Sequence, residues 1–325
     1  MDEVQTPCFN PFTMDVSPKL ENQIKLWADE LGFIACGITL ANAISEKDTR
    51  NFDTWIHSGF HGEMKYMENH REKRLQPTEL IPGAKSIICL AYNYFSPTTS
   101  ADNIQTPKFA RYAWGEDYHR VVKDKVHLLM GKILEASPEF EGRGFTDSAP
   151  VMERQLAERA GLGWIGKNSL LLRKGIGSYF FLAEIICNLD LLPDNPMNTD
   201  HCGTCTACID ACPTQAIVQP QVVNSNLCIS YQTIEKKGDS SLSVEEHQGW
   251  VYGCDICQEV CPWNRFSEPH NEPRFNAREF VQADSNQWKQ WINDPDAFQL
   301  ILKNTASERT GHRKILSEVR RQINS

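Results

Sequence analysis

Eight of the twelve cysteines lie between residues 202 and 261, close enough in the sequence to bind metal together. The first run is Cys202-x2-Cys205-x2-Cys208-x3-Cys212-Pro213. This is the bacterial ferredoxin spacing, in which three thiolates bind one cubane cluster and the fourth Cys, before Pro, binds the other. The second run is Cys254-x2-Cys257-x3-Cys261-Pro262, and Val251 occupies the position of a further expected Cys. Because two cubanes need eight thiolates, Cys228 must supply the missing one.

The cysteine pattern therefore predicts two 4Fe–4S clusters with interleaved ligands. One cluster would be bound by Cys202, Cys205, Cys208 and Cys261, and the other by Cys212, Cys228, Cys254 and Cys257. The alternative is zinc, but tetrahedral zinc sites use two well-separated pairs of ligands, and a closely spaced triple would leave thiolates unused. Iron–sulfur clusters move single electrons. Since a long segment precedes them, we expect a ferredoxin-like module fused to a catalytic domain.

Three motifs in the preceding segment could bind a cofactor, but their contexts do not support it. Residues 161–166 match G-x-G-x-x-G, yet a dinucleotide-binding motif follows a strand, whereas this one follows a helical run. The same segment imitates a P-loop, but Asn168 stands where a magnesium-binding Ser or Thr would be. Asp117-Tyr118-His119 resembles the D-x-H of cobalt-ligating proteins, but Val122 replaces its Gly. We therefore do not expect His119 to ligate cobalt.

The segment Asp147-Ser148-Ala149-Pro150-Val151-Met152-Glu153-Arg154 is the most informative part of the front half. Its simplest interpretation is the start of a helix, with Asp147 and Ser148 as caps and Pro150 in the first turn. Arg154 would then form an ordinary surface ion pair. A catalytic interpretation of the same residues needs further support.

The elements that would position these residues follow from hydrophobic periodicity. The pattern predicts helices at 19–32, 117–136 and 150–160, and strands at 33–39, 86–94 and 179–187. The fold class is α+β, with an α/β front domain at 1–197, a two-cluster ferredoxin-like domain at 198–265 and a helical tail at 266–325. Residues 191–196 form the expected linker, because two prolines and several turn formers interrupt both periodicities.

Composition limits the class of protein. The formal net charge of −9 argues against nonspecific coating of nucleic acid or of an anionic membrane. Mean hydropathy is −0.44, and no long apolar run or secretory signal appears, so we expect a cytoplasmic protein without a membrane span. The other cysteines occur singly, and Cys36, Cys89 and Cys187 lie in apolar runs typical of buried thiols; the fourth is Cys8.

The sequence resembles the epoxyqueuosine reductase family from about residue 20 to 320. The resemblance is carried by the Asp147–Arg154 segment, by the run from Ala157 to Ser169, and by the eight-cysteine pattern. Five shorter motifs add to it: His61-Gly62-Glu63-Met64, Arg111-Tyr112, Asp117-Tyr118-His119, Cys228-Ile229-Ser230-Tyr231 and Tyr252-Gly253-Cys254-Asp255. It implies reduction of the epoxide of epoxyqueuosine in tRNA to an alkene, by an enzyme that uses cobalamin, without a protein histidine on cobalt, and two clusters.

The same resemblance assigns residue roles. Asp147 matches the family's proton donor, and such an acid works at neutral pH only if burial raises its pKa. The implied cobalamin-binding residues are Arg154, Trp164, Gly166, Lys167, Asn168, Ser169, Ser230 and Asp255. Two other functions remain open: a cobalamin-dependent reductive dehalogenase, which would normally carry a twin-arginine signal that this chain lacks, and a ferredoxin-type electron carrier without cobalamin.

The C-terminal tail is a candidate tRNA contact. From Lys303 onward it has six cations and two anions, a formal charge of +4, and Lys236 and Lys237 add further candidates. The simpler interpretation is a solvated basic helix face. Relatives continue into a fuller helical-repeat domain, so the extent of tRNA contact is open. The expected partners are tRNA carrying epoxyqueuosine and a low-potential electron donor, and we expect a monomer.

Overall fold

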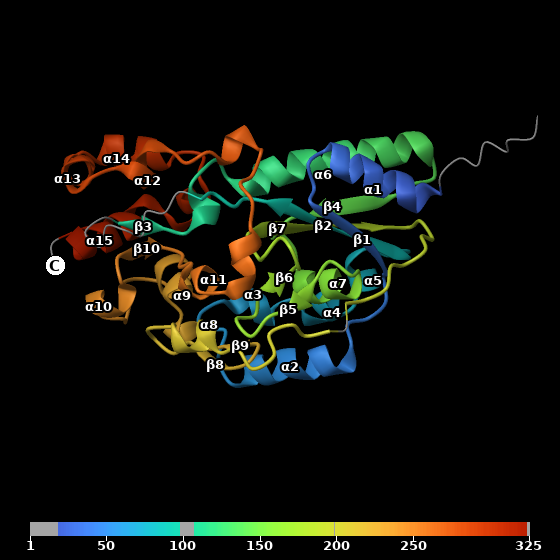
Figure 1. Cartoon of the computed structure of the whole chain (residues 1–325), viewed down its shortest axis with the longest axis horizontal. Coiled ribbons are helices and arrows are strands. Elements are labelled where there is room, and N and C mark those ends of the chain that lie inside the picture. Colours follow the sequence, from blue (N-terminus) through green and yellow to red (C-terminus); the bar gives the residue numbers. More distant parts are fainter. Residues whose placement is uncertain (1–18, 98–106, 198, 324–325) are drawn as a thin grey trace, which may run out of the picture.

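A computed structural model describes residues 19–97, 107–197 and 199–323. Its centre is a four-stranded antiparallel sheet in the order β1-β2-β7-β4 (Figure 1). The strands are β1 (Ala35–Leu40), β2 (Ser86–Asn93), β7 (Phe180–Cys187) and β4 (Gly142–Phe145). The two central strands pair over their full length, from Ser86 opposite Cys187 to Asn93 opposite Phe180. The three predicted strands are confirmed, although the first begins at Ala35 rather than at residue 33.

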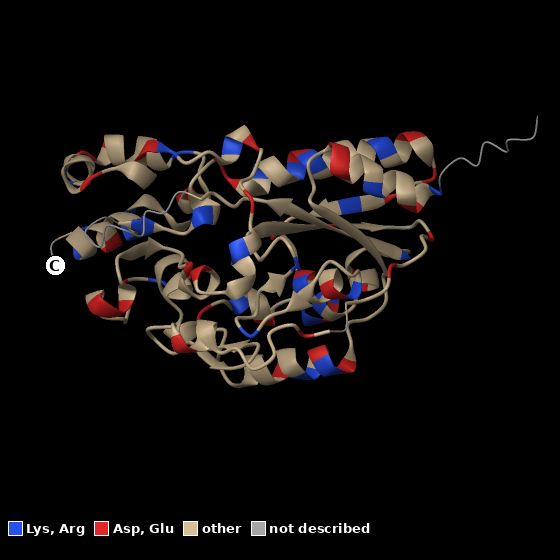
Figure 2. Cartoon of the chain, in the orientation of Figure 1, with Lys and Arg blue, Asp and Glu red and all other residues tan. Residues whose placement is uncertain are grey.

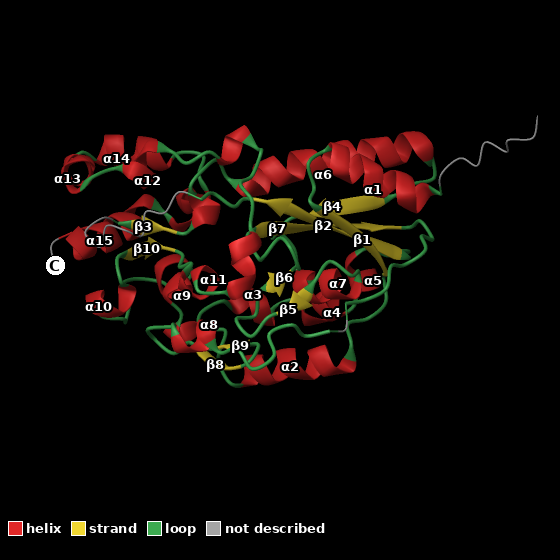
Figure 3. Ribbon diagram, in the orientation of Figure 1, coloured by secondary structure: helices red, strands yellow, loops and turns green. Residues whose placement is uncertain are grey.

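Other elements cover both faces of the sheet, which explains why the sequence of β2 is a continuous apolar run. Ile88 and Leu90 belong to the core on one face, and Ile87 and Cys89 to the core on the other. On the first face lie α1 (Leu20–Glu30) and α6 (Tyr118–Ala136), and on the second lies α7 (Glu153–Arg159) (Figure 3). Charges of both signs occur along α1, α2 (Glu46–His57) and α6 (Figure 2), as expected for solvated helix faces.

The third predicted helix is shorter than expected. It begins at Glu153 instead of residue 150, and Thr146 to Met152 form a loop without regular structure. Pro150 is compatible with a first helical turn, but here it lies in this loop, so the prediction of its position was wrong. The predicted exit at Gly161 is confirmed, because this residue has φ of +76°, which glycine adopts without strain.

The cysteine-rich segment is built from short elements. Its helices and strands are α8 (Ala207–Asp210), β8 (Ile217–Gln219), β9 (Val222–Val223), α9 (Ile229–Ile234), α10 (Val244–His247), β10 (Trp250–Tyr252) and α11 (Ile256–Glu259). β10 pairs in parallel with β3 (Lys108–Phe109) of the front half. The cysteine-rich segment is therefore joined to the front half by a ladder that no local sequence pattern predicts.

The tail is largely helical, as predicted. It contains α12 (Glu279–Gln282), α13 (Ser285–Asn293), α14 (Pro295–Leu302) and α15 (His312–Ile323), which gather at the end of the molecule away from α1 (Figure 1). Phe109 stacks on Trp288, with ring centroids 5.9 Å apart. The core on the α1 and α6 side of the sheet thus continues into the tail.

The remaining elements are one twelve-residue helix and several short helices, strands and turns. They are α2 (Glu46–His57), α3 (Lys65–Glu68), α4 (Arg71–Leu75), α5 (Pro77–Leu80), β5 (Trp164–Ile165), β6 (Leu171–Leu172) and the 3-10 turns at Arg111–Ala113, Ser225–Leu227, Pro262–Phe266, Pro273–Phe275 and Ala306–Thr310. No helix in the described ranges is long and apolar enough to cross a membrane. Cys89 and Cys187 are buried as predicted and Cys36 is half-buried, whereas Cys8 lies outside the described residues.

Candidate active site and cluster ligands

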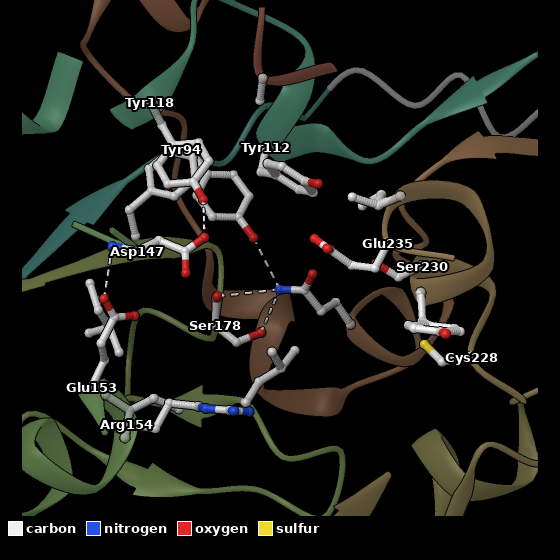
Figure 4. A pocket seen from close by; sticks show the side chains of 18 of the residues that line it. Tyr94, Tyr112, Tyr118, Asp147, Glu153, Arg154, Ser178, Cys228, Ser230 and Glu235 are labelled. Carbon is white, nitrogen blue, oxygen red and sulfur yellow. Dashed lines mark hydrogen bonds between the residues drawn. The ribbon is translucent and has the colours of Figure 1, made fainter. Parts of the chain in front are cut away.

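A cavity of about 490 Å³ lies where the front half, the cysteine-rich segment and the tail meet. Asp147, Glu153 and Arg154 lie on one side of it, and Cys228, Ser230 and Glu235 lie on the other (Figure 4). Aromatic rings and apolar side chains of β6 and β7 complete the wall. The mixture of apolar surface with a few convergent polar groups is typical of a cofactor or substrate site.

Asp147 lies in the loop between β4 and α7 and faces this cavity. Its side chain is 59% exposed, and its backbone has φ of +45°, in the left-handed region. The Tyr118 hydroxyl donates a hydrogen bond to Asp147 Oδ2 at 2.6 Å, and His119 Nε2 lies 3.7 Å from the same oxygen. Tyr118 and His119 are the first residues of α6, so the end of one helix positions two partners of Asp147.

The pKa values of Asp147 and His119 depend on the contact between these two residues. Burial does favour the neutral form of Asp147, but hydrogen bonds from His119 and Tyr118 outweigh it, so the carboxyl pKa is lowered. The expectation that burial raises this pKa applied to a site closed by the bound corrin, and it stays a prediction. Burial also opposes the charged form of His119, yet hydrogen bonds to Asp117 and Asp147 raise the pKa of His119 to about 9. At neutral pH the transferable proton of this pair therefore resides on His119.

Asp117 fixes the orientation of the imidazole. Its Oδ1 lies 2.7 Å from His119 Nδ1 and accepts the His119 backbone N–H at 3.0 Å, which also caps α6. With Nδ1 engaged by Asp117, Nε2 is directed toward Asp147. The motif that the sequence offered as a cobalt ligand is thus an Asp–His–Asp chain of hydrogen-bonding groups.

Glu153 and Glu184 lie behind Asp147. Glu153 Oε1 accepts the backbone N–H of Asp147 at 2.8 Å. Burial and the charge of Asp147 raise the pKa of Glu153 to about 8. Glu184, on β7, is fully buried without a hydrogen-bond partner for either carboxyl oxygen among the described residues. Burial, followed by the charges of Glu153 and Asp147, raises the pKa of Glu184 well above its ordinary value.

Arg154 lines the cavity, and its side chain forms no ion pair with the residues that the structure describes. Its Nη1 donates to the backbone carbonyl of Ser169, and burial lowers the pKa of its guanidinium. Ser169 has φ of +65°, and its buried hydroxyl has no partner among the described residues. These two predicted residues therefore lie together at the edge of the cavity.

The loop before Ser169 contacts the cysteine-rich segment. Lys167 Nζ donates to the carbonyls of Gly203 and Cys205 at 2.7 and 2.9 Å, and Asn168 Nδ2 donates to the Cys257 carbonyl at 3.3 Å. Gly166 is packed so closely that an added Cβ would lie 2.5 Å from Leu172 Cδ1. Lys167 and Asn168 thus hold cysteine loops, and neither residue is among those lining the cavity.

Two other predicted cofactor contacts also lie away from the cavity wall. Trp164 is buried and packs edge-on against His201 and Trp263, with ring centroids 4.8 and 5.1 Å apart. Asp255 is 2% exposed and accepts from the Arg111 backbone at 2.8 Å and from its guanidinium at 3.2 Å. Ser230, in contrast, does line the cavity.

The first predicted set of cysteines lies together near the surface. Burial and then the charges of Cys261, Cys202 and Cys205 raise the pKa of Cys208 to about 11, which places these four thiols within electrostatic reach of one another. Cys205 is exposed and the other three are partly exposed. All are free thiols. The grouping supports the predicted ligand set.

The second set lies deeper. Burial, and then charges that include those of Cys228 and Cys212, raises the pKa of Cys257, and Cys257 and Cys228 act in the same way on Cys254. No group of three or more His, Cys, Asp or Glu in the described ranges is arranged to hold a single metal ion. In a 4Fe–4S cluster each thiolate ligand binds a separate iron atom. Cys228 also lines the cavity, so this set reaches the candidate site.

Several cavity residues were missed at the sequence level. Gln258 Nε2 donates to Tyr94 Oη at 3.3 Å and to Ser178 Oγ at 3.1 Å, which ties the residue after Cys257 to the front half (Figure 4). Arg309 of the tail lines the cavity and pairs with Glu235 at 2.7 Å. A local signal existed for Tyr118 and His119 and for four other lining residues in motifs of the family resemblance: Met64, Tyr112, Tyr231 and Tyr252. The others are brought in by long-range contacts.

Comparisons with known proteins agree with the arrangement. Residues 201–264 match a family model described as a 4Fe–4S double cluster binding domain, and residues 74–148 match one described as epoxyqueuosine reductase QueG, DUF1730. An epoxyqueuosine reductase of Cellulophaga algicola is 48% identical over 302 residues, 91% of this chain and 96% of the relative. One of Vibrio cholerae is 42% identical over 91% of this chain and 80% of the relative.

Solved structures give the same result. A crystal structure of epoxyqueuosine reductase with a tRNA-Tyr epoxyqueuosine-modified stem loop matches with a TM-score of 0.83 and 30% identity, over 94% of this chain and 80% of the other. The Bacillus subtilis enzyme, with its catalytic aspartate loop swung out of the active site, also has a TM-score of 0.83, at 29% identity over 94% of this chain and 81% of that one. On these grounds the chain belongs to the epoxyqueuosine reductase family.

Proposed function

We propose that this chain reduces the epoxide of epoxyqueuosine in tRNA to the alkene of queuosine, using two 4Fe–4S clusters and cobalamin. The observation that carries the proposal is one cavity in which a proton-bearing group, Asp147 with Tyr118 and His119, faces Cys228 of the deeper thiol set. The residues that would supply the proton and a thiol of the electron-carrying set therefore border the same cavity. Membership of the family supports this assignment.

The chemistry sets what the residues must do. Converting an epoxide to an alkene consumes two electrons and two protons, breaks both C–O bonds and releases the oxygen as water. Cobalamin, when bound, supplies low-valent cobalt that delivers electrons to carbon, and the clusters supply those electrons one at a time. The protein must hold the epoxide and protonate its departing oxygen.

Protonation is the task of the Asp147 group. His119 passes its proton across the 3.7 Å separation between its Nε2 and Asp147 Oδ2, and Asp147 delivers that proton to the departing oxygen. The Tyr118 hydroxyl donates a hydrogen bond to the same Oδ2, and Asp117 stabilises the imidazolium. The carboxylate alone, with its lowered pKa, would hold little proton at neutral pH. The imidazole next to it makes the acid usable.

The cavity and its rim fit cobalamin chemically. Apolar side chains from β6 and β7 suit the macrocycle. Arg154, Ser230 and the Ser169 hydroxyl, which has no hydrogen-bond partner among the described residues, offer polar contacts to its amide groups. Five other predicted residues would act indirectly, because they hold the loops around the site and do not line the cavity: Trp164, Gly166, Lys167, Asn168 and Asp255. The proposed ligand sets of the clusters are those predicted, and the three-domain division at residues 197 and 265 describes the units that carry these tasks.

The proposed substrate is tRNA carrying epoxyqueuosine, as in the relative solved with a modified stem loop. A single nucleoside would use the cavity alone, whereas tRNA also offers phosphates to exposed cations of the tail. A protein that modifies tRNA in this way would work in the cytoplasm with a low-potential electron donor.

The test is reduction of epoxyqueuosine tRNA by anaerobically reconstituted protein, followed by nucleoside mass analysis. Asp147→Asn keeps the size of the side chain but removes its transferable proton. We expect cobalamin and about eight iron atoms per chain to be retained, and epoxide reduction to fall by roughly 10²-fold or more.

The matched control is Asp124→Asn, because Asp124 is an exposed carboxylate that pairs with Arg274 outside the cavity. It should turn over like the unchanged protein. Full turnover by Asp147→Asn would reduce Asp147 to a loop residue, and absence of turnover by the reconstituted parent protein would reject the proposed function.

A further inference from the structure

The conformation of Asp147 needs an explanation that its own side-chain partners do not provide. Tyr118 and His119 contact the carboxyl group, whereas the backbone has φ of +45°, which residues other than glycine rarely adopt. Such a conformation persists only where the surrounding structure holds it. Something must therefore fix the backbone of the loop at Asp147.

Glu153 provides that contact. It is the first residue of α7, and its Oε1 accepts the Asp147 backbone N–H at 2.8 Å, which closes the loop from Thr146 to Met152 at its base (Figure 4). Within the loop itself, the backbone bond from Val151 N to Ala149 O at 2.8 Å does not involve Asp147. The Glu153 hydrogen bond is thus what ties the Asp147 backbone to the helix that follows the loop.

The surroundings of Glu153 differ from those of an acidic residue that only stabilises the N-terminus of a helix. An acidic residue in the first turn is stabilised when it is solvated near the helix N-terminus. Glu153 instead lies beside Asp147 and in electrostatic contact with the fully buried Glu184. Three acidic side chains brought together in this way repel one another when charged, so packing alone would not favour Glu at this position.

We propose that Glu153 is a positioning residue, whose carboxyl oxygen holds the Asp147 loop so that the Asp147 carboxyl faces the cavity. This inference rests on the proposed role of Asp147 as proton donor. What Glu153 contributes is an acceptor oxygen at the right place, and the negative charge is not required. A neutral side chain with the same oxygen should therefore do the same work.

Two substitutions separate these properties. Glu153→Gln keeps an acceptor oxygen and removes the charge, whereas Glu153→Met keeps the length and removes the acceptor. The measurement is hydrogen–deuterium exchange resolved to single amides, on protein that contains its clusters. We expect the Asp147 amide to exchange at least tenfold faster in Glu153→Met and at the parent rate in Glu153→Gln.

Turnover gives an independent reading. In Glu153→Met, kcat should fall with little change in KM, because the substrate site is intact and the acid is misplaced, while Glu153→Gln should restore kcat. The matched control is Glu158→Met on the same helix, since Glu158 Oε1 accepts the Ile165 backbone N–H at 2.9 Å. That variant should speed exchange at Ile165 and leave the Asp147 amide slow.

The outcomes decide the proposal. Parent-like exchange at Asp147 in Glu153→Met would overturn it, and so would equally fast exchange in Glu153→Gln. If Glu153→Met does not fold, Glu153→Ala is compared with Glu153→Gln in the same way. The exchange result does not depend on the reaction, so a failure of epoxyqueuosine reduction by the parent protein would reject the proposed function without deciding the role of Glu153.

Discussion

At the residue scale, the proton chemistry of the cavity depends on His119 as much as on Asp147. The resemblance identified Asp147, but the sequence could not show that its carboxylate would lie beside an imidazole, because the residues are far apart in the chain. The separation of 3.7 Å and the opposite pKa shifts of the two groups are results of the folded structure.

His119 also makes stability depend on pH. Burial lowers the pKa of His119, but hydrogen bonds to Asp117 and Asp147 outweigh burial. The pKa is therefore raised from an ordinary value of 6.5 to about 9. A raised pKa in the folded state means that the folded protein holds the proton more tightly. The contribution is therefore fully present below about pH 6.5 and is lost as the pH rises through about 9.

We predict that the difference in unfolding free energy between the parent and His119→Gln shrinks between about pH 6.5 and pH 9. Denaturant unfolding at a series of pH values measures it. His127→Gln is the control, because His127 lies on the same helix and does not line the cavity. A difference that stays constant over this range would show that His119 does not hold the proton in the folded state.

At the element scale, the loop at residues 166–169 connects the cavity to both thiol sets. Lys167 donates to carbonyls of the loop that carries Cys205, and Asn168 donates to the carbonyl of Cys257. The glycines of the G-x-G-x-x-G motif at residues 161–166 provide the tight turns and close packing that such a connection requires.

We predict that Lys167→Met weakens the more exposed thiol set selectively. Loss of two hydrogen bonds to the loop that carries Cys205 should make this loop more mobile. The cluster bound by the more exposed thiol set should therefore be lost sooner to a chelator or to air. The cluster of the deeper set should keep its iron. Iron release and electron paramagnetic resonance of the reduced protein report the two clusters. Lys174→Met, at an exposed lysine nearby in sequence, should release iron at the parent rate.

Some helices and strands of the fold could be predicted from sequence patterns, and others could not. The long helices and buried strands were predictable, because β2 and α6 bury regular apolar faces. The start of α7 was not, because Pro150 satisfies the rule for a first turn equally well in a loop. What decides between the two is the contact from Glu153 to Asp147, which depends on the folded arrangement.

At the scale of the whole molecule, the cavity exists only when all three parts of the chain are docked. The tail is held by the hydrogen bond from Tyr252 to the Ala306 carbonyl at 2.9 Å, by the pair of Arg309 with Glu235, and by the buried Glu318 beside His247. None of these pairs has a local sequence signature. The composition of the cysteine-rich segment predicted its clusters, but not the wall it shares with the front half and the tail.

The docking of the tail also changes which cations are available to tRNA. Arg309 pairs with Glu235 at the cavity, and Lys314 Nζ donates to the Lys236 carbonyl, so both have structural tasks. Lys303 and Arg313 have exposed side chains outside these contacts. These exposed cations fit a solvated helix face and also a contact with tRNA phosphates.

We predict that Lys303→Gln with Arg313→Gln weakens tRNA binding about equally for all tRNAs, because phosphate contacts carry no sequence information. Counterion release predicts that the slope of log affinity against log salt falls by about one for each phosphate that is no longer neutralised. Affinity is measured across a salt series with cofactor-replete protein. The control is Lys132→Gln with Lys123→Gln, which removes the same charge from α6. If affinity and slope are equal in the two double variants, the tail surface does not carry the phosphates, and the tRNA must dock elsewhere around the cavity.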